Sequence, residues 1–235
     1  MGMSTARTVV VGVTGSIAAY KACEIVSRLR QLGLTVRVVM TKASTKFVSP
    51  LTFRTLSENP VHVSMFGASS PWNVEHVSLA QAADVLLVAP ATANFLGKLA
   101  AGVADDLLLT TVLATRAPVL IAPAMNTRMY ENPIVQANLS RLRAFGYGII
   151  EPGVGRLACG AEGTGRLRDV EEIIRRVREA VEVRATLSGK RVVVIESCAP
   201  VQAGCLLSEG KGGVIARRLA LGAVARGGSV RLVTR

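Results

Sequence analysis

The chain has 235 residues, of which half are hydrophobic, 19% are charged and 4% are aromatic. This length suits one large domain, or one domain followed by a fragment of a second. Such an apolar composition can bury a core and excludes an intrinsically disordered chain. Small aliphatic residues and glycine dominate, which fits buried parallel strands covered by closely packed helices.

The formal net charge is +12, which favours partners such as nucleic acid, an anionic membrane or phosphorylated small molecules. From Arg184 onward, nine Lys and Arg residues stand against two Glu residues, so this tail alone carries +7. No aromatic side chains are interleaved with that charge. A stacking platform for single-stranded nucleic acid is therefore not expected, and a solvated basic surface is the simpler interpretation.

The most apolar stretch, residues 82–125, is interrupted by charged residues and prolines. It contains no run approaching the about 20 apolar residues that a membrane-spanning helix needs, so no membrane contact is expected. The first residues lead directly into a strand pattern without the features of a signal peptide, which favours the cytoplasm. The four cysteines match neither a zinc motif nor a redox pair, so free thiols and no metal site are expected.

In chain order, the pattern opens with an apolar strand at residues 8–14, a break at 15–16, and a helix at 17–32 with apolar residues at helical spacing. Gly33 ends that helix, and residues 35–40 form a second strand. This is the strand–turn–helix–strand unit of a parallel, right-handed crossover.

The same alternation continues along the chain. Helices are expected at 44–47, 50–57, 73–83, 93–102, 107–114 and 132–145. Strands are expected at 85–89, 118–122 and 147–150, each stopped by a proline. The alternation predicts an α/β fold, a three-layer Rossmann-like (flavodoxin-like) sandwich around a parallel sheet.

The last part of the chain has a different pattern. The glycine-rich residues 153–168 are expected to form a mobile loop, followed by an amphipathic helix at 170–183. One further strand–loop–helix–strand unit is then expected at 190–195, 214–226 and 230–234. That is too little for an independent nucleotide-binding domain. We therefore expect a main domain at 1–186 and a partial second domain at 187–235.

Ligands of such folds bind beyond the carboxyl ends of the strands. Gly15 would let the backbone turn tightly there, and Ser16 could cap the next helix, whose free N–H groups suit a phosphate. A plain helix cap is the alternative interpretation. Residues 90–94 and 123–126 stand at two further strand ends, and the standard dinucleotide fingerprint is absent.

Three side chains are candidates for chemistry. His76 lies in a polar segment before a helix and could exchange a proton near neutral pH, although a lone histidine is more often structural. Asn126 follows a buried strand and could hydrogen-bond a carboxylate without adding a charge. Cys159 lies among glycines with little core around it, so its thiol could close over a substrate and deliver a proton.

Five short motifs occur together in the chain. They are Gly15-Ser16-Ile17-Ala18, His76-Val77-Ser78-Leu79, Ala89-Pro90-Ala91-Thr92-Ala93-Asn94, Pro123-Ala124-Met125-Asn126 with Met129, and Ala158-Cys159-Gly160. In this order they resemble the homo-oligomeric flavin-containing cysteine decarboxylases, most closely the decarboxylase half of the bifunctional coenzyme A biosynthesis flavoprotein. The resemblance covers about residues 8–183.

The resemblance implies FMN as the cofactor, with its phosphate end held by Gly15, Ser16 and Ile17. It implies that Asn126 binds the substrate carboxylate from a neighbouring subunit. His76 would assist the oxidation, and Cys159 would protonate the enethiolate. The remaining flavin contacts would come from Thr41, Ser44, Phe47, Ser78, Pro90, Ala91, Thr92, Asn94 and Met125.

The resemblance also implies a reaction and an assembly. The substrate would be 4′-phosphopantothenoylcysteine, a phosphorylated thiol carboxylate. Oxidation of its thiol to a thioaldehyde gives the electrons left by CO₂ a place to go, and re-reduction yields 4′-phosphopantetheine. The active site would lie between the subunits of a trimer or dodecamer.

The tail departs from the resemblance. Ser197-Cys198-Ala199-Pro200 stands where the ligase half has a Gly-Pro-Thr turn, and most of a ligase domain is missing. No ligase activity is therefore expected from these residues.

Two other classes of function stay open. A peptidyl-cysteine decarboxylase shares much of the site, whereas a flavin prenyltransferase needs neither His76, Cys159 nor the Pro-Ala-Met-Asn motif. A non-catalytic regulatory subunit that binds a phosphatase or nucleic acid through the basic tail is the second class. The presence of all three candidate catalytic residues argues against it.

Overall fold

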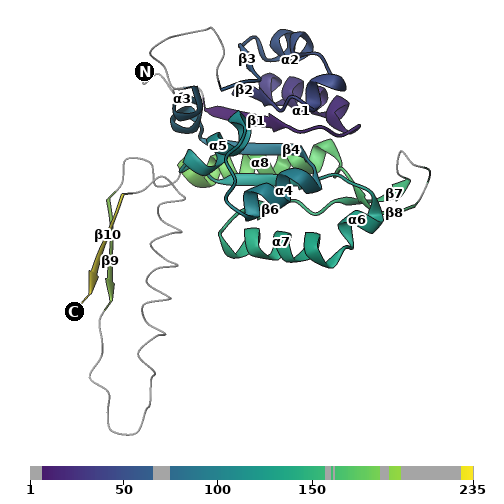
Figure 1. Cartoon of the computed structure of the whole chain (residues 1–235). Coiled ribbons are helices and arrows are strands. Elements are labelled where there is room, and N and C mark those ends of the chain that lie inside the picture. The colour runs from purple at the N-terminus through teal and green to yellow at the C-terminus, as the bar shows by residue number, and fades with distance from the viewer. Residues whose placement is uncertain are drawn as a thin grey trace, which may run out of the picture. The chain divides into compact units, whose positions relative to one another are not determined.

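The computed structural model describes residues 7–65, 75–156, 160, 162–185, 191–196 and 229–234 (Figure 1). The chain divides into two compact units, Met1–Arg178 and Glu179–Arg235. The expected functional division between a decarboxylase domain at 1–186 and a ligase-like remnant at 187–235 stays a prediction.

The first unit is built on a six-stranded sheet with the order β3-β2-β1-β4-β5-β6, in which every neighbouring pair is parallel. The strands are β1 (Thr8–Val13), β2 (Thr35–Met40), β3 (Val61–His62), β4 (Val85–Ala91), β5 (Val119–Pro123) and β6 (Gly148–Ile149). The predicted α/β class with a parallel sheet is confirmed. The short strand β3 has too few residues to give a periodic signal in the sequence.

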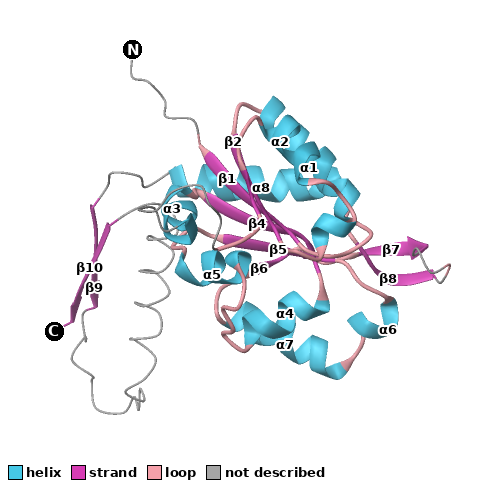
Figure 2. Cartoon of the chain, turned by 45° about the horizontal axis from the view of Figure 1, so that its top comes forward, coloured by secondary structure: helices cyan, strands magenta, loops and turns pink. Residues whose placement is uncertain are grey.

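Helices cover both faces of this sheet (Figure 2). One face carries α1 (Ala19–Gln31), α2 (Pro50–Ser57) and the start of α8 (Val170–Ala185). The other carries α3 (Glu75–Ala82), α4 (Ala93–Ala100), α5 (Leu107–Ala114) and α7 (Pro133–Ala144). The short helices η1 (Ser44–Lys46) and α6 (Thr127–Tyr130) follow β2 and β5. An ion pair between Arg28 and Glu171 joins α1 to α8.

The core lies between the sheet and these two helical layers. All residues of β4 and β5 are buried, which is the physical origin of their unbroken apolar runs in the sequence. Leu96, Leu108 and Leu139 are fully or almost fully buried from the α4, α5 and α7 side. Ile25 and Val177 are fully buried in α1 and α8. The apolar residues that predicted amphipathic helices in the sequence are therefore the ones that these helices bury in the core.

The expectation that Pro90 stops its strand is wrong, because β4 runs to Ala91, whereas β5 does end at Pro123, its last residue. Proline lacks the N–H that a regular ladder uses, so it is accommodated at irregularities. The register between β4 and β5 shifts after Val88, and Ala91 then pairs with Pro123. The Ala89–Pro90 peptide bond is cis.

The expectation of a mobile loop at 153–168 is also wrong for the residues that the structure describes. They form an antiparallel hairpin of β7 (Gly153–Arg156) and β8 (Glu162–Arg166). Glycine weakens a strand in general, but it is used where another backbone approaches closely. The hairpin meets such a backbone at the end of β5, as described below.

In the second unit, β9 (Arg191–Glu196) and β10 (Ser229–Thr234) pair in parallel, which confirms the two strands predicted there. The helix predicted at 214–226 lies outside the described residues. No helix within the described ranges combines the length and the apolar character that crossing a membrane would require.

Candidate active site

A cavity of about 680 Å³ lies beyond the carboxyl ends of the central strands. The residues that directly follow β1, β2, β4 and β5 all contribute to its wall: Thr14, Thr41, Thr92 and Ala124. Strands β1 and β4 are neighbours, while α1 and α4 leave them on opposite faces of the sheet. This reversal opens a crevice, which is where folds of this class bind ligands.

Thr14 holds the two central strand ends together. Its Oγ1 donates a hydrogen bond to the carbonyl of Pro90 (2.8 Å) and accepts one from the amide of Thr92 (3.1 Å). The side chain is 1% exposed, the bond to the Pro90 carbonyl is buried, and the bond from the Thr92 amide is partly buried. Sequence reasoning missed this residue, because a threonine at the end of an apolar strand looks like an ordinary β-former.

The turn after β1 is shaped for close backbone approach. A Cβ on Gly15 would lie 2.5 Å from the Cβ of Ala43, so the residue at 15 must be glycine for the two turns to pack. Ser16 Oγ accepts a hydrogen bond from the amide of Ala18 (3.2 Å). The amides of Gly15 and Ile17 donate to no residue that the structure describes. Two N–H groups before α1 are thus available to an anion.

The turn after β2 forms the facing wall. Thr41 lines the cavity, and its Oγ1 accepts a hydrogen bond from the amide of Ser44 (3.3 Å). Ser44 is fully buried and donates its hydroxyl to the carbonyl of Thr41 (2.7 Å), so it fixes the turn rather than facing the cavity. Ile17 and Phe47 are 58% and 49% exposed, and neither lines the cavity.

The end of β4 contributes Thr92 and Asn94 to the wall. Thr92 caps α4 by accepting a hydrogen bond from the amide of Phe95 (3.4 Å). Pro90 and Ala91 are buried beneath the wall and contribute no surface to it.

At the end of β5, Met125 and Met129 line the cavity, while Asn126 lies beside them and caps α6 through a bond from the amide of Arg128 (2.9 Å). The amide of Met125 donates to the carbonyl of Gly165 (2.9 Å). A Cβ on Gly165 would lie 2.4 Å from the carbonyl oxygen of Met125. The β7–β8 hairpin is therefore anchored on the turn that carries Asn126. Cys159, between the two hairpin strands in the sequence, lies outside the described residues.

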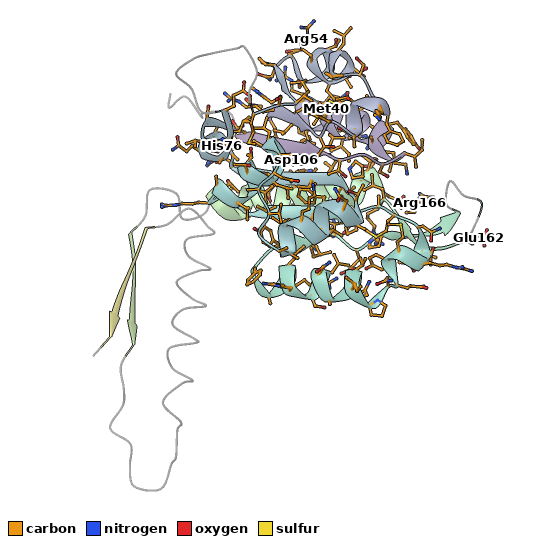
Figure 3. All side chains as sticks on the ribbon, in the orientation of Figure 1. Met40, Arg54, His76, Asp106, Glu162 and Arg166 are labelled. Atoms are coloured by element: carbon orange, nitrogen blue, oxygen red, sulfur yellow. The ribbon has the colours of Figure 1, made fainter. Side chains whose placement is uncertain are left out.

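The two remaining predicted residues are on α3. His76 and Ser78 are both half-buried there, and neither lines the cavity. Figure 3 labels His76 on this helix and Asp106 at the start of α5, against which α3 packs. The neighbouring Glu75 pairs with Nδ1 of His62 (3.4 Å), which ties α3 to β3.

The cavity wall also carries charged groups that sequence reasoning missed. Lys98 Nζ lies 2.5 Å from Asp105 Oδ2, and this hydrogen bond raises the pKa of Lys98. Asp106 caps α5 by accepting a bond from the amide of Leu109 (2.8 Å). An Asp pair directly before an apolar helix was the available signal, because aspartate favours helix N-termini.

Another part of the cavity wall is apolar. It includes Met65, Phe95, Leu107, Leu109 and Met125. Unpaired amides before α1, apolar side chains and a few polar groups match what a flat cofactor with a phosphate needs. The residues present therefore fit FMN.

A hydrogen-bonded cluster joins α6 to α7 and to Glu151. The Tyr130 hydroxyl donates to Glu151 Oε2 (2.7 Å), and Arg143 donates to Glu151 Oε1 (2.5 Å). Burial, followed by this bond to Glu151, raises the pKa of Tyr130 to about 12, so the phenol keeps its proton. The cluster fixes the helix that Asn126 caps.

Comparisons with known proteins agree with this geometry. The sequence profile of the family described as Flavoprotein matches residues 2–182. The coenzyme A biosynthesis bifunctional protein CoaBC of Bacillus subtilis (strain 168) is 46% identical over 235 residues, covering 97% of this chain and 57% of the relative. The chain thus spans little more than half of that relative's length. A probable phosphopantothenoylcysteine decarboxylase of Streptococcus mutans serotype c is 45% identical over 175 residues, covering 74% of this chain and 98% of the relative.

Two solved structures superpose on most of this chain. A PPC decarboxylase mutant complexed with pantothenoylaminoethenethiol superposes with a TM-score of 0.66 at 33% identity, covering 74% of this chain and 97% of that one. The FMN-dependent cysteine decarboxylase SpaF superposes with a TM-score of 0.63 at 33% identity, covering 76% and 99%.

Proposed function

Since the chain belongs to the flavoprotein family, we propose that it is an FMN-dependent decarboxylase that converts 4′-phosphopantothenoylcysteine into 4′-phosphopantetheine. The observation that carries the proposal is the cavity at four strand ends, with free amides at Gly15 and Ile17 and the Asn126 turn on its border. The relatives named for this reaction and the neighbour named for an aminoethenethiol ligand support the choice of substrate.

The described residues would hold the cofactor in one orientation. The amides of Gly15 and Ile17, with the hydroxyl of Ser16, would bind its phosphate, because unpaired N–H groups at a helix start attract anions. Phe95 and Leu107 would exclude water from the ring. When bound, FMN would supply the two-electron oxidation of the substrate thiol and the later return of those electrons.

The chain's own side chains would then position the substrate and move protons. The Asn126 amide would bind the carboxylate without neutralising it, so that CO₂ can still leave. Loss of CO₂ places an electron pair on the thioaldehyde, which becomes an enethiolate. Cys159 would donate the proton that this carbon skeleton takes up, and His76 would assist removal of the thiol proton. The net change replaces a carboxylate with hydrogen.

We also propose that the protein acts as a homo-oligomer with active sites between subunits. Ile17, Tyr20 and Phe47 are large hydrophobic side chains that are 58%, 61% and 49% exposed, and they stand close to Gly15 or Ala43 in the sequence. Burying them against a second copy of the chain would remove this apolar surface from water. Light scattering of the purified protein tests this, and a monomer at all concentrations would contradict it.

The proposed reaction is tested by adding phosphopantothenoylcysteine to the flavin-loaded protein and following CO₂ and phosphopantetheine. We expect Cys159→Ser to stop at an oxidised enethiol product. The matched control is Cys23→Ser, because Cys23 is on α1 and burial raises the pKa of its thiol. A wild-type protein that does not act on phosphopantothenoylcysteine but decarboxylates a peptide ending in cysteine would instead be a peptidyl-cysteine decarboxylase.

A further inference from the structure

The helix that Asn126 caps is too short to hold its own position. Helix α6 has four residues. Its single turn is closed by two backbone bonds, from the amide of Tyr130 to the carbonyl of Asn126 (2.9 Å) and from Glu131 to Thr127 (2.8 Å). One isolated turn is unfavourable, because the first bonds of a helix each fix several residues. The position of Asn126 therefore depends on contacts between α6 and the rest of the protein.

Tyr130 makes such contacts at the C-terminal end of α6. Its carbonyl accepts a hydrogen bond from Gln136 Nε2 (2.5 Å), and its hydroxyl donates to Glu151 Oε2 (2.7 Å). The side chain packs against the hydrophobic core and does not line the cavity, whereas the preceding Met129 does. Tyr130 thus holds α6 in place without contributing to the wall that a ligand would touch.

The acceptor of the Tyr130 hydroxyl is itself tied to the sheet. Glu151 directly follows Ile150, whose amide donates to the carbonyl of Ile121 in β5 (2.8 Å). Arg143 on α7 binds the second carboxylate oxygen of Glu151, and bonds to an ionised group are the stronger kind. The chain also runs directly from β5 into Asn126. Both ends of α6 are therefore attached to the same strand, one through the backbone and one through the Tyr130–Glu151 bond.

We propose that Tyr130 is a positioning residue for the reaction: its bond to Glu151 holds α6 where Asn126 meets the carboxylate of the substrate. The inference rests on the proposed function for the identity of that carboxylate. It goes further by giving a part in the reaction to a residue outside the cavity wall. The hydroxyl is a permanent donor at neutral pH, because burial and Glu151 raise the pKa of Tyr130 to about 12.

The test uses two substrate analogues in which hydrogen replaces the thiol, so that neither can be oxidised. Phosphopantothenoylalanine keeps the carboxylate, and phosphopantothenoylethylamine lacks it. Their binding to the FMN-loaded full chain is followed by the change in flavin absorption. Wild-type protein should bind the alanine analogue more tightly. Tyr130→Phe should weaken that binding about threefold to tenfold, the range for one lost hydrogen bond, and leave the ethylamine analogue unchanged.

The ratio of the two Kd values separates positioning from a loss of folded protein. Fewer folded, flavin-loaded molecules would lower the binding capacity for both analogues and leave the ratio unchanged. Tyr147→Phe is the matched control, since Tyr147 packs on the same core, burial raises its pKa, and its hydroxyl bonds to no residue that the structure describes. Its Kd ratio should equal that of the wild type.

A double-mutant cycle tests whether Tyr130 acts through Glu151. Glu151→Ala should change the ratio as Tyr130→Phe does, and the double variant should be no worse than Glu151→Ala, because both changes remove the same bond. Losses that add in the double variant would overturn the inference. An unchanged ratio in Tyr130→Phe, or an equal change in Tyr147→Phe, would overturn it as well.

Failure of the inference can be told apart from failure of the proposed function. Wild-type protein that forms phosphopantetheine but binds both analogues equally would leave the decarboxylation standing and refute a carboxylate site that Tyr130 positions. Wild-type protein that binds neither analogue and forms no phosphopantetheine would overturn the proposed function, and this inference with it.

Discussion

The bridge that Thr14 makes between β1 and β4 gives a quantitative prediction for Thr14→Val. Valine has nearly the same shape, so the change removes the hydroxyl without leaving a cavity. The Pro90 carbonyl keeps its bond from the amide of Thr14 (3.3 Å), but the amide of Thr92 loses its acceptor. A partly buried amide left without an acceptor costs about 1–3 kcal/mol and the second lost bond about 1 kcal/mol, so the free energy of unfolding should fall by about 2–4 kcal/mol.

Urea unfolding of the flavin-free protein, followed by far-UV circular dichroism, measures this loss. With a slope of about 2 kcal/mol per M urea, the midpoint should fall by about 1 M or more. Thr14→Ser is the control because it keeps the hydroxyl and loses only a methyl group, which costs about 1 kcal/mol or less. If the valine and serine variants unfold at the same urea concentration, the bridge does not stabilise the strand ends and the reasoning is refuted.

Three further predictions concern the cavity and its supports. Gly15→Ala should weaken FMN binding at least about tenfold in fluorescence titration, because its Cβ would collide with Ala43; unchanged affinity would contradict the close packing. Gly165→Ala should lower kcat at least about tenfold with flavin binding intact, because its Cβ would displace the hairpin from Met125, and a normal kcat would argue against a hairpin role. The pKa of Tyr130 is raised from 10.0 to about 12 in the folded protein, so on raising the pH the unfolded chain loses the phenol proton before the folded chain does. The free energy of unfolding should therefore fall as the pH rises from about 10 to about 12. The expected fall is about 1 kcal/mol after allowance for solvent screening. Urea midpoints at pH 9 and 11 test this, and an identical fall in Tyr130→Phe would exclude Tyr130 as its cause.

The fold class could be predicted from the sequence because buried parallel strands leave unbroken apolar runs, as in β4 and β5. The same logic located much of the cavity. Carboxyl ends of parallel strands meet at one edge of a sheet, so Gly15, Thr92 and Met125 were expected together, and all three line the cavity.

What the sequence could not predict depends on contacts between distant segments. The Thr14–Pro90 bond and the Met125–Gly165 bond each join residues with no local signal for pairing. The hairpin was missed for this reason, because Gly163 is explained only by the Thr127 side chain that it meets and Gly165 only by the backbone of Met125. Ser44 was expected at the flavin, but it is fully buried and its hydroxyl bonds to the carbonyl of Thr41 three residues earlier, a local turn contact that its motif did not reveal.

This chain should release CO₂ from a cysteine carboxylate only when flavin is bound. The most direct measurement compares flavin-free and FMN-reconstituted protein with phosphopantothenoylcysteine, using mass spectrometry to detect phosphopantetheine. We expect product from the reconstituted protein and none from the flavin-free protein. Product formation at equal rates without FMN, or no product from a fully reconstituted protein, would contradict the account.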